Sequence, residues 1–359
     1  MKIGIILISD GWAGAENAVY NIIKNLVNLK TDTVLFTNEE IIKYYSNLKN
    51  VNKINLGRVY RCGRLLEWIN YFRISKELDK KIQNQKIDII ILFLEGSIII
   101  FSKIYKRYNI PTIVSLRGGE TNFYNENTLR YLRKIHVIIP VIKLLNISKI
   151  IHSNSKWQIS NLPEKYKQKT VVIPNGVDTK VFKSLKHIKQ KDNVILFTGR
   201  FIDIKGIREL INVAKQLPQY EFWFAGQGPL DNLIQGKNIK NLGFKSTEEL
   251  VKLYNQATIV TQPSYREGFP NCGLEAMACG KPVIATPLGF SEYIENEKDG
   301  IIIPSKYEKA LKESIERLMK DKKLRDKLGK NARKKALGYS WEKVAKQYLE
   351  VFKSVANQK

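Results

Sequence analysis

The sequence predicts an α/β protein with two successive parallel sheets, and three observations support this fold class. Short runs rich in Ile, Val and Leu alternate with longer amphipathic segments along most of the 359 residues. The apolar runs are nearly continuous, as expected for strands of a parallel sheet that is covered by helices on both faces. The alternation pauses at a polar, Lys-rich stretch over 183–192 and then restarts. A chain of this length can form two domains with separate cores.

The elements follow in a regular order in both halves. In the first half we expect strands at KIGIILIS, DTVLFT, IDIIILFLE and PTIVSLRG, and helices over 16–29, 65–83 and 98–108. In the second half we expect strands at NVILFTGR, YEFWFAG, TIVTQPS and KPVIATP, and helices over 206–216, 248–257, 273–279, 307–320, 322–337 and 341–352. We interpret 183–192 as the linker, which gives domains over 1–180 and 181–340. Ligands of such sheets bind outside the carboxyl ends of the strands, here in a cleft between the domains.

The charge and the cysteine content limit the partners and the compartment. The net charge of +26, from 60 Lys and Arg against 34 Asp and Glu, favours anionic partners or reflects general solubility. The basic residues follow no helix-turn-helix, zinc or RNA-recognition pattern, so no nucleic-acid partner is expected. Three cysteines without a CxxC pair indicate a reducing, cytoplasmic location.

Any membrane contact is expected to be peripheral, because no apolar run in the sequence is long enough to span a bilayer. The N-terminal run reads as a buried strand and not as a signal peptide. The segment 128–145 carries basic residues among many Leu, Ile and Val, and such a segment can lie on anionic lipid at the inner face of the membrane. A solvated helix face over a buried stripe explains the same pattern equally well.

The most informative stretch is PSYREGFPNCGLEAMACGKP, from Pro263 to Pro282. A strand ends there, a loop with a glycine follows, and a short helix begins near Gly273, where free N–H groups form an anion site. Glu267 and Glu275 could accept hydrogen bonds from sugar hydroxyls, one on a donor sugar and one on a ribose. The alternative makes Glu275 a partner of the helix dipole and Glu267 a solvated loop residue.

Cations follow another strand in TGRFIDIKGI. Arg200 and Lys205 could neutralise a diphosphate leaving group without a metal, although surface cations are common. Gly14, between the first strand and the first helix, could let backbone approach a phosphate. The sequence has no DxD motif, P-loop, GxSxG or HExxH, and its histidines form no cluster of ligands. We therefore expect neither a metal nor a cofactor.

Taken together and in this order, these segments resemble the family 4 retaining glycosyltransferases over nearly the whole chain. The segments that carry the resemblance are PNGVD, GRFIDIKG, AGQGP, EGFPNCGLEAMACGKPVIATPLG, NEKDGIIIP and SWEKVAKQYLEVF. The resemblance implies the GT-B fold, with two Rossmann-like domains whose parallel sheets face a central cleft. It also implies that the first domain binds the acceptor, that the second binds a nucleotide sugar, and that the helix over 341–359 packs back on the first.

The resemblance also assigns roles by position. Glu275 would hold the ribose and Glu267 the donor sugar, while Arg200 and Lys205 would hold the diphosphate under the Gly14 backbone. The catalytic residues are then Arg200, Lys205 and Glu267. Further donor contacts are expected at Phe244 near the base and at Phe269, Pro270, Asn271, Cys272, Gly273 and Leu274.

One position departs from the family. Many relatives have a His near the reacting centre, at the strand end that corresponds to SLRGGE, where this chain has Arg117 and Gly118. We expect both residues to contact substrate, with the role of Arg117 left open.

The expected reaction is retaining transfer of a sugar from a nucleoside-diphosphate sugar, with UDP favoured. The expected acceptor is a glycan or a lipid-linked oligosaccharide in the synthesis of bacterial capsule, lipopolysaccharide or O-antigen. The alternative is a sugar-nucleotide epimerase or hydrolase on the same fold, which needs a general acid or base that the histidines do not supply.

Overall fold

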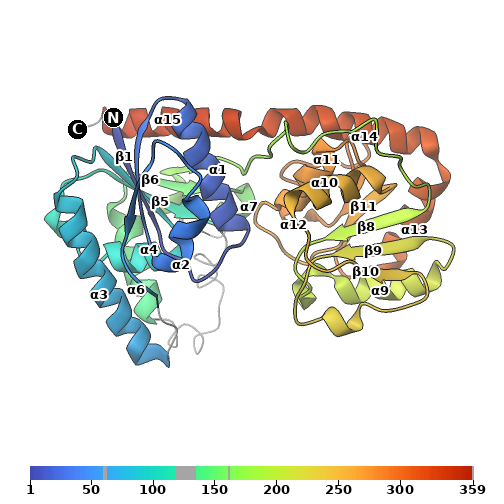
Figure 1. The fold of residues 1–359 in the computed structure, drawn as a ribbon, viewed down its shortest axis with the longest axis horizontal. Coiled ribbons are helices and arrows are strands. Elements are labelled where there is room, and N and C mark those ends of the chain that lie inside the picture. Colours follow the sequence, from blue (N-terminus) through green and yellow to red (C-terminus); the bar gives the residue numbers. More distant parts are fainter. Residues whose placement is uncertain (60–62, 118–134, 161, 358–359) are drawn as a thin grey trace. The chain divides into compact units, whose positions relative to one another are not determined.

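The structure is a computed structural model that describes residues 1–59, 63–117, 135–160 and 162–357 (Figure 1). The chain forms two compact units: unit 1 comprises Met1–Pro174 with Trp341–Lys359, and unit 2 comprises Asn175–Ser340. The stretch 183–192, which the sequence suggested as a linker, lies inside unit 2. It is held there because the Leu185 N–H donates to Asn255 Oδ1 (2.8 Å) and the Lys191 N–H donates to the Gln256 carbonyl (2.9 Å).

The described part of unit 1 contains a parallel sheet of seven strands in the order β3-β2-β1-β4-β5-β6-β7. The strands are β1 (Lys2–Leu7), β2 (Asp32–Thr37), β3 (Asn52–Asn55), β4 (Ile89–Phe93), β5 (Thr112–Leu116), β6 (Ile150–Ser153) and β7 (Thr170–Val172). The strand order reverses between β1 and β4, and this switch point is where open parallel sheets bind ligands.

Helices cover both faces of this sheet (Figure 1). On one face lie α1 (Gly14–Asn28) and α15 (Trp341–Ala356); on the other lie α3 (Gly63–Gln83), α4 (Leu94–Phe101) and α6 (Ile135–Ile147). Shorter helices are α2 (Glu39–Ile42), α7 (Lys156–Ser160) and α8 (Glu164–Lys167). The apolar residues of α1 recur at the helical spacing of Val19, Ile22, Ile23 and Leu26, and all four are buried against the sheet.

The sheet of unit 2 repeats this topology, with six described parallel strands in the order β10-β9-β8-β11-β12-β13. The strands are β8 (Val194–Thr198), β9 (Glu221–Ala225), β10 (Ile239–Asn241), β11 (Ile259–Gln262), β12 (Val283–Ala285) and β13 (Ile301–Ile302). One face carries α9 (Ile207–Gln216) and α13 (Glu308–Lys320), and the other carries α10 (Thr247–Gln256), α11 (Asn271–Ala278) and α14 (Lys322–Ala336). The short helix α12 (Pro287–Phe290) follows β12. The switch point of this sheet lies between β8 and β11.

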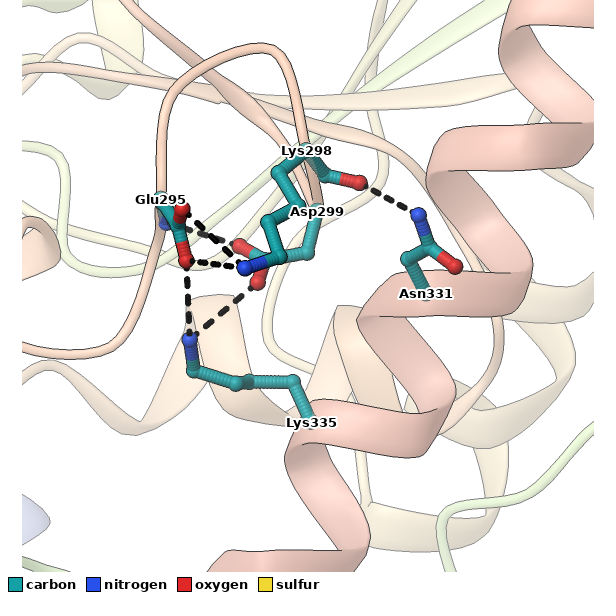
Figure 2. A network of polar contacts seen from close by, with 5 residues as sticks. All are labelled: Glu295, Lys298, Asp299, Asn331 and Lys335. Carbon is teal, nitrogen blue, oxygen red and sulfur yellow. Dashed lines mark hydrogen bonds and ion pairs between the residues drawn. The ribbon is translucent and has the colours of Figure 1, made fainter.

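A polar network fixes the turn before β13 to α14 (Figure 2). The Lys335 ammonium lies 3.2 Å from the buried Asp299 carboxylate, and Asn331 Nδ2 donates to the Lys298 carbonyl at 2.7 Å. Asp299 also accepts a hydrogen bond from the Glu295 N–H at 2.7 Å, while Lys298 pairs with the Glu295 carboxylate. Because these groups are satisfied by one another, the NEKDG segment has a structural role in this fold.

Two sequence-based boundaries were wrong. The helix expected over 98–108 is instead α4 (Leu94–Phe101) followed by a 3₁₀ turn over 105–107. The strand expected to reach Glu95 ends at Phe93, because Leu94 adopts a left-handed conformation with φ of 67° and begins the helix. The apolar run continues across this junction, so its composition did not mark the change from strand to helix.

Candidate active site

Two loops of unit 2 meet at the carboxyl ends of β8 and β11. The Tyr265 N–H of the second loop donates to the Ile204 carbonyl of the first at 2.8 Å. Gly206 adopts φ of 69° at the start of α9, and a Cβ there would lie 2.1 Å from the Pro263 carbonyl oxygen. Glycine is therefore required at 206, since any side chain would separate the two loops.

The close packing of the two loops brings together two of the residues predicted from the sequence. The Lys205 ammonium donates to Glu267 Oε1, and the side chains retain 16% and 14% of their exposure. A Cβ at Gly289, whose φ is 89°, would lie 2.6 Å from the Glu267 Cβ, so the backbone of α12 packs closely against the base of the Glu267 side chain. An ion pair that is mostly withdrawn from water but still reachable suits a site that binds a polar ligand.

The other expected cation is placed differently. Arg200 follows Gly199 directly after β8, and its side chain is exposed. The Arg200 carbonyl accepts a hydrogen bond from the Ile202 N–H at 3.1 Å, but within the described residues the Arg200 side chain has no hydrogen bond or ion pair, with Lys205 or any other residue. Its guanidinium is thus available to an anionic ligand at the end of β8.

Glu275 lies in α11 with its side chain partly buried. The Tyr254 hydroxyl donates to Glu275 Oε2 at 3.1 Å. Burial raises the pKa of Glu275 to about 7, against the smaller opposing effect of this hydrogen bond. The carboxyl group therefore changes its charge near neutral pH, which is unusual for a surface glutamate.

The Cys272 thiol is close enough to Lys205, Glu267 and Glu275 for all three charges to affect it. Burial raises the pKa of its thiol to about 12; the charge of Lys205 lowers that pKa, and the charges of Glu267 and Glu275 raise it. The structure thus places Lys205, Glu267, Cys272 and Glu275 in one neighbourhood of unit 2. A thiol with so high a pKa stays protonated and is no nucleophile at neutral pH.

The start of α11 is held by residues that the sequence reasoning did not single out. Asn175 Nδ2 donates to the Phe269 carbonyl and to Asn271 Oδ1, each at 3.0 Å. The Tyr293 hydroxyl donates to the Pro270 carbonyl at 2.8 Å. Asn175 belongs to the PNGVD segment of the family resemblance, which was the only signal that could have marked it.

Three of the expected donor contacts are positions where core packing determines the residue. Phe269 is buried with its ring centre 5.0 Å from that of Tyr293, and Leu274 is fully buried. A Cβ at Gly273 would lie 2.2 Å from the Tyr293 hydroxyl, so packing alone requires a glycine there. These positions, and the buried Pro270, can offer a ligand only their backbone groups.

Phe244 lies apart from these loops. It follows Gly243, which has φ of 68°, in the turn after β10, and it is 70% exposed. An aromatic ring that is this exposed can stack on a planar ligand without giving up contacts in the protein core.

In unit 1, Gly14 begins α1 at the carboxyl end of β1. A Cβ at Gly14 would meet nothing within 4 Å, so packing does not require a glycine. The turn itself is fixed by Glu16, whose carboxylate accepts hydrogen bonds from the Ala13 N–H (3.0 Å) and the Ser9 hydroxyl. This satisfied carboxylate is a capping group.

Arg117 directly follows β5. Its Nη2 donates to the Tyr348 hydroxyl of α15 at 3.0 Å, and its guanidinium carbon lies 5.0 Å from the centre of the Phe93 ring. The Tyr348 oxygen lies 2.9 Å from His152 Nε2, and the Ser115 hydroxyl lies 2.7 Å from Nδ1. Gly118, the other expected substrate contact of this strand end, lies outside the described residues.

His152 is buried inside this network and is neutral. Burial lowers its pKa to about 3, with a further contribution from the positive charge of Arg117. Across the described ranges, no three His, Cys, Asp or Glu residues gather closely enough to bind a metal ion. Nor does any helix in the described part of the chain combine the length and apolar character needed to cross a bilayer.

Comparison with known proteins extends this picture. Residues 178–335 match the family described as glycosyl transferases group 1, and residues 12–181 match Glycosyltransferase Family 4. The chain is 28% identical to an uncharacterized glycosyltransferase of Methanocaldococcus jannaschii over 94% of both chains. It is 24% identical, over 99% of both chains, to a Campylobacter jejuni enzyme named for α-1,4-N-acetyl-D-galactosaminyl transfer to a GalNAc-containing, undecaprenol-linked diphospho-oligosaccharide.

Solved structures agree with the fold described above. Sucrose-phosphate synthase from Thermosynechococcus elongatus aligns with a TM-score of 0.86 at 20% identity over 100% of both chains. Anabaena HepE in complex with UDP-glucose aligns with a TM-score of 0.80 at 18% identity over 99% of this chain and 100% of HepE. The two parallel-sheet units are therefore those of a GT-B protein, and the protein is a glycosyltransferase. The chain belongs to the family 4 glycosyltransferases. The alternative of an epimerase or hydrolase is not favoured by these relatives.

Proposed function

We propose that the protein transfers a sugar, with retention of configuration, from a nucleoside-diphosphate sugar to a glycan or lipid-linked oligosaccharide. One observation carries the proposal: the Lys205–Glu267 pair and Glu275 act on the same Cys272 thiol near the switch point of unit 2. There a cation for a diphosphate and two carboxylates for sugar hydroxyls converge, within a chain of the glycosyltransferase family.

In this proposal unit 2 binds the donor. Arg200 and Lys205 neutralise the diphosphate, Glu267 accepts hydrogen bonds from the donor sugar, and Glu275 accepts them from the ribose. The exposed Phe244 ring lies near the base, and the Gly14 backbone approaches the phosphates. The UDP-glucose that HepE binds supports UDP as the nucleotide.

Retention follows from attack on the same face of the sugar. The bond between the anomeric carbon and the diphosphate oxygen breaks, and its electron pair passes to the diphosphate. The acceptor oxygen bonds to the anomeric carbon on that face and gives its proton to the departing phosphate oxygen. Glu267 is held by the Lys205 ammonium, which favours a role as hydrogen-bond acceptor over one as nucleophile.

We propose that this reaction needs no metal ion, because Arg200 and Lys205 supply the positive charge that the leaving group requires. The assay is release of nucleoside diphosphate from a panel of UDP-, GDP- and ADP-sugars, with and without glycolipid acceptors, in the presence and absence of a chelator. We expect acceptor-dependent release from a UDP-sugar that survives chelation, and a product whose anomeric configuration by NMR equals that of the donor. Loss of turnover on chelation would contradict metal independence. A product of inverted configuration would contradict retention. Epimer formation or rapid free-sugar release from donor alone would support the alternative.

We further propose that unit 1 binds the acceptor at the inner face of the cytoplasmic membrane, in the synthesis of a bacterial surface polysaccharide. The undecaprenol-linked substrate in the name of the C. jejuni relative supports a lipid-linked acceptor. Of the basic segment 128–145, residues 135–145 belong to α6, where Ile139 is 58% exposed. On α3 the exposed Phe72 ring lies 4.6 Å from the Lys76 ammonium. Exposed apolar groups beside lysines suit an anionic bilayer surface.

Liposome flotation tests this part alone. We expect the protein to float with vesicles that contain anionic lipid at low salt and to be released at high salt. An Ile139→Glu substitution should weaken flotation, while Lys323→Glu on the exposed start of α14 serves as a control with a larger loss of positive charge. Absence of binding to anionic vesicles would remove the membrane contact from the proposal.

A further inference from the structure

Four side chains of unit 2 form a hydrogen-bonded chain that ends on Glu275. Gln262 Nε2 lies 3.2 Å from Thr198 Oγ1, Thr198 Oγ1 lies 2.8 Å from the Tyr254 hydroxyl, and that hydroxyl lies 3.1 Å from Glu275 Oε2. The chain connects the ends of β11 and β8 to α10 and then to α11. Gln262, Thr198 and Tyr254 are all buried.

The chemistry of the four groups gives the chain one direction. The ionised Glu275 carboxylate can only accept, and the Tyr254 hydroxyl donates to it at 3.1 Å; the Cys272 carbonyl is a second acceptor for this hydroxyl, at 3.3 Å. The Tyr254 oxygen then accepts from the Thr198 hydroxyl, whose oxygen accepts from the Gln262 amide. Every step has a donor and an acceptor, and bonds in such a series strengthen one another in a low-dielectric interior.

We propose that Tyr254, supported by Thr198 and Gln262, is a positioning residue that keeps the Glu275 carboxylate ionised and oriented to receive the sugar nucleotide. The inference rests on the ribose-binding role proposed for Glu275. Burial works against the charged carboxylate, and the Tyr254 hydrogen bond is the contact that opposes this effect. Removing the phenolic hydroxyl should therefore make the carboxylate harder to ionise.

Four titratable groups that Glu275 influences do not change their charge in the pH range of the experiment. The titratable groups that Glu275 influences are Tyr254 from α10, Cys272 from α11, Cys279 at the end of α11 and Tyr293 after α12. Burial raises the pKa of both thiols to about 12 and raises those of both phenols well above their ordinary value. These four groups stay neutral between pH 6 and 9.

Further charged groups act on the same two thiols: the Lys205–Glu267 pair on Cys272, and Lys281 and Arg333 on Cys279. Burial lowers the pKa of Lys281 to about 8, so its titration overlaps that of Glu275. All of these groups are left intact in every variant used below. A change in the pH dependence of donor binding is then assigned to Glu275 by comparison with Glu275→Gln.

The experiment measures the KM for the donor and kcat from pH 5.5 to 9 in the full-length protein. For Tyr254→Phe we expect the midpoint of the KM profile to move up by about one pH unit, which raises KM roughly fivefold at pH 7 and little at pH 9. Thr198→Val leaves the phenol in place and should shift the midpoint in the same direction by less. We expect kcat at saturating donor to change little, because the ribose is held equally in the ground and transition states.

Tyr166→Phe is the matched control, since it removes another buried phenolic hydroxyl, which donates to Asn146 Oδ1 at 2.8 Å in unit 1. An unshifted midpoint in both Tyr254→Phe and Thr198→Val, or a KM raised equally at every pH, would overturn the inference. If Glu275→Gln itself binds donor like the unsubstituted protein at every pH, the proposed ribose contact fails first. If Glu275→Gln binds the donor weakly while the KM midpoint is unshifted in Tyr254→Phe and Thr198→Val, only the positioning role of the hydrogen-bonded chain is refuted.

Discussion

Each unit has a buried tyrosine that hydrogen-bonds to a charged side chain, but the two charges are opposite. In unit 2, Tyr254 of α10 receives a hydrogen bond from the end of β8 and passes one to the Glu275 carboxylate. In unit 1, Tyr348 of α15 lies against His152 of β6 and accepts a hydrogen bond from the Arg117 guanidinium. Each tyrosine thus links a polar side chain on a strand, Thr198 or His152, to a charged side chain beyond the carboxyl end of a strand.

The difference lies in what pH can change. A guanidinium is not deprotonated in proteins, whereas Glu275 gains or loses its charge near neutrality. The neutral imidazole of His152 is the group that acidification threatens in unit 1. In unit 1 the charged group is Arg117, and the pH-sensitive group is His152 in the network that holds it. In unit 2 the charged group, Glu275, is itself pH-sensitive, and the Tyr254 that holds it is neutral.

The largest effect is expected at the site in unit 2. Lys205→Ala should lower kcat/KM by about 100-fold to 1,000-fold, because it removes charge stabilisation from the leaving group. Lys335→Ala is the matched control, since Lys335 also pairs with a carboxylate but lies in the structural network of Figure 2. We expect that control to unfold more easily and to transfer sugar at a nearly normal rate. Steady-state kinetics and thermal unfolding of both variants check this, and near-normal transfer by Lys205→Ala would refute its assignment.

Glu275→Gln should stabilise the unliganded protein at alkaline pH. The folded-state pKa of Glu275 is about 7, raised from 4.5, so its favourable contribution is complete below pH 4.5 and is lost as pH rises through 7. At pH 8 we expect the variant to gain about 2 to 3 kcal/mol, with little gain at pH 4.5. Denaturant unfolding at both pH values is the measurement; an equal effect at both would contradict the shifted pKa.

His152→Gln should show the opposite pH trend in unit 1. The folded-state pKa of His152 is lowered from 6.5 to about 3, so its stability is present above pH 6.5 and is lost as pH falls toward 3. Between pH 6.5 and 5 this loss is on the order of 2 kcal/mol. The variant should be less stable at neutral pH but should lose less on acidification. Denaturant unfolding over this range tests it, and an unchanged slope would show that His152 is not the sensitive group.

Tyr348→Phe should lower kcat/KM by roughly threefold to tenfold, because Arg117 loses one hydrogen bond of its support. The position of its pH–rate profile should be unchanged, in contrast to Tyr254→Phe, since the guanidinium stays charged. Kinetics of the single variants and of the Arg117→Ala, Tyr348→Phe pair measure the coupling. Additive effects of the two substitutions would contradict a positioning role for Tyr348.

The smallest effect on stability is expected for Gly14→Ala. A Cβ at this position has open space around it, so stability should be unchanged or rise by up to about 1 kcal/mol. The KM for donor should nevertheless rise if a phosphate approaches this backbone. Gly11→Ala, which also meets nothing within 4 Å, is the control and should leave KM unchanged. Equal KM values in the two variants would remove Gly14 from the donor site.

Much of the fold followed from local pattern. Strands such as β2 and β8 have five consecutive buried residues, and helices such as α9 repeat their apolar residues at helical spacing. The short strands β3, β6, β7, β10 and β13 were missed; β3 and β10 carry few apolar residues and form by pairing with a neighbour. Pairing with a distant segment leaves no periodic signal in the strand itself.

The sequence by itself determined the alternation of strands and helices, the order of two parallel sheets, and the stretch from Pro263 to Pro282 that supplies Glu267 and Glu275. These depend on spacing along the chain, which a sequence displays directly. Only the tertiary structure decided which side chains are partners: Lys205 with Glu267, Tyr254 with Glu275, and Arg117 with Tyr348. Such contacts join segments far apart in the chain, and the burial that shifts the pKa of Glu275 exists only once those segments have packed together.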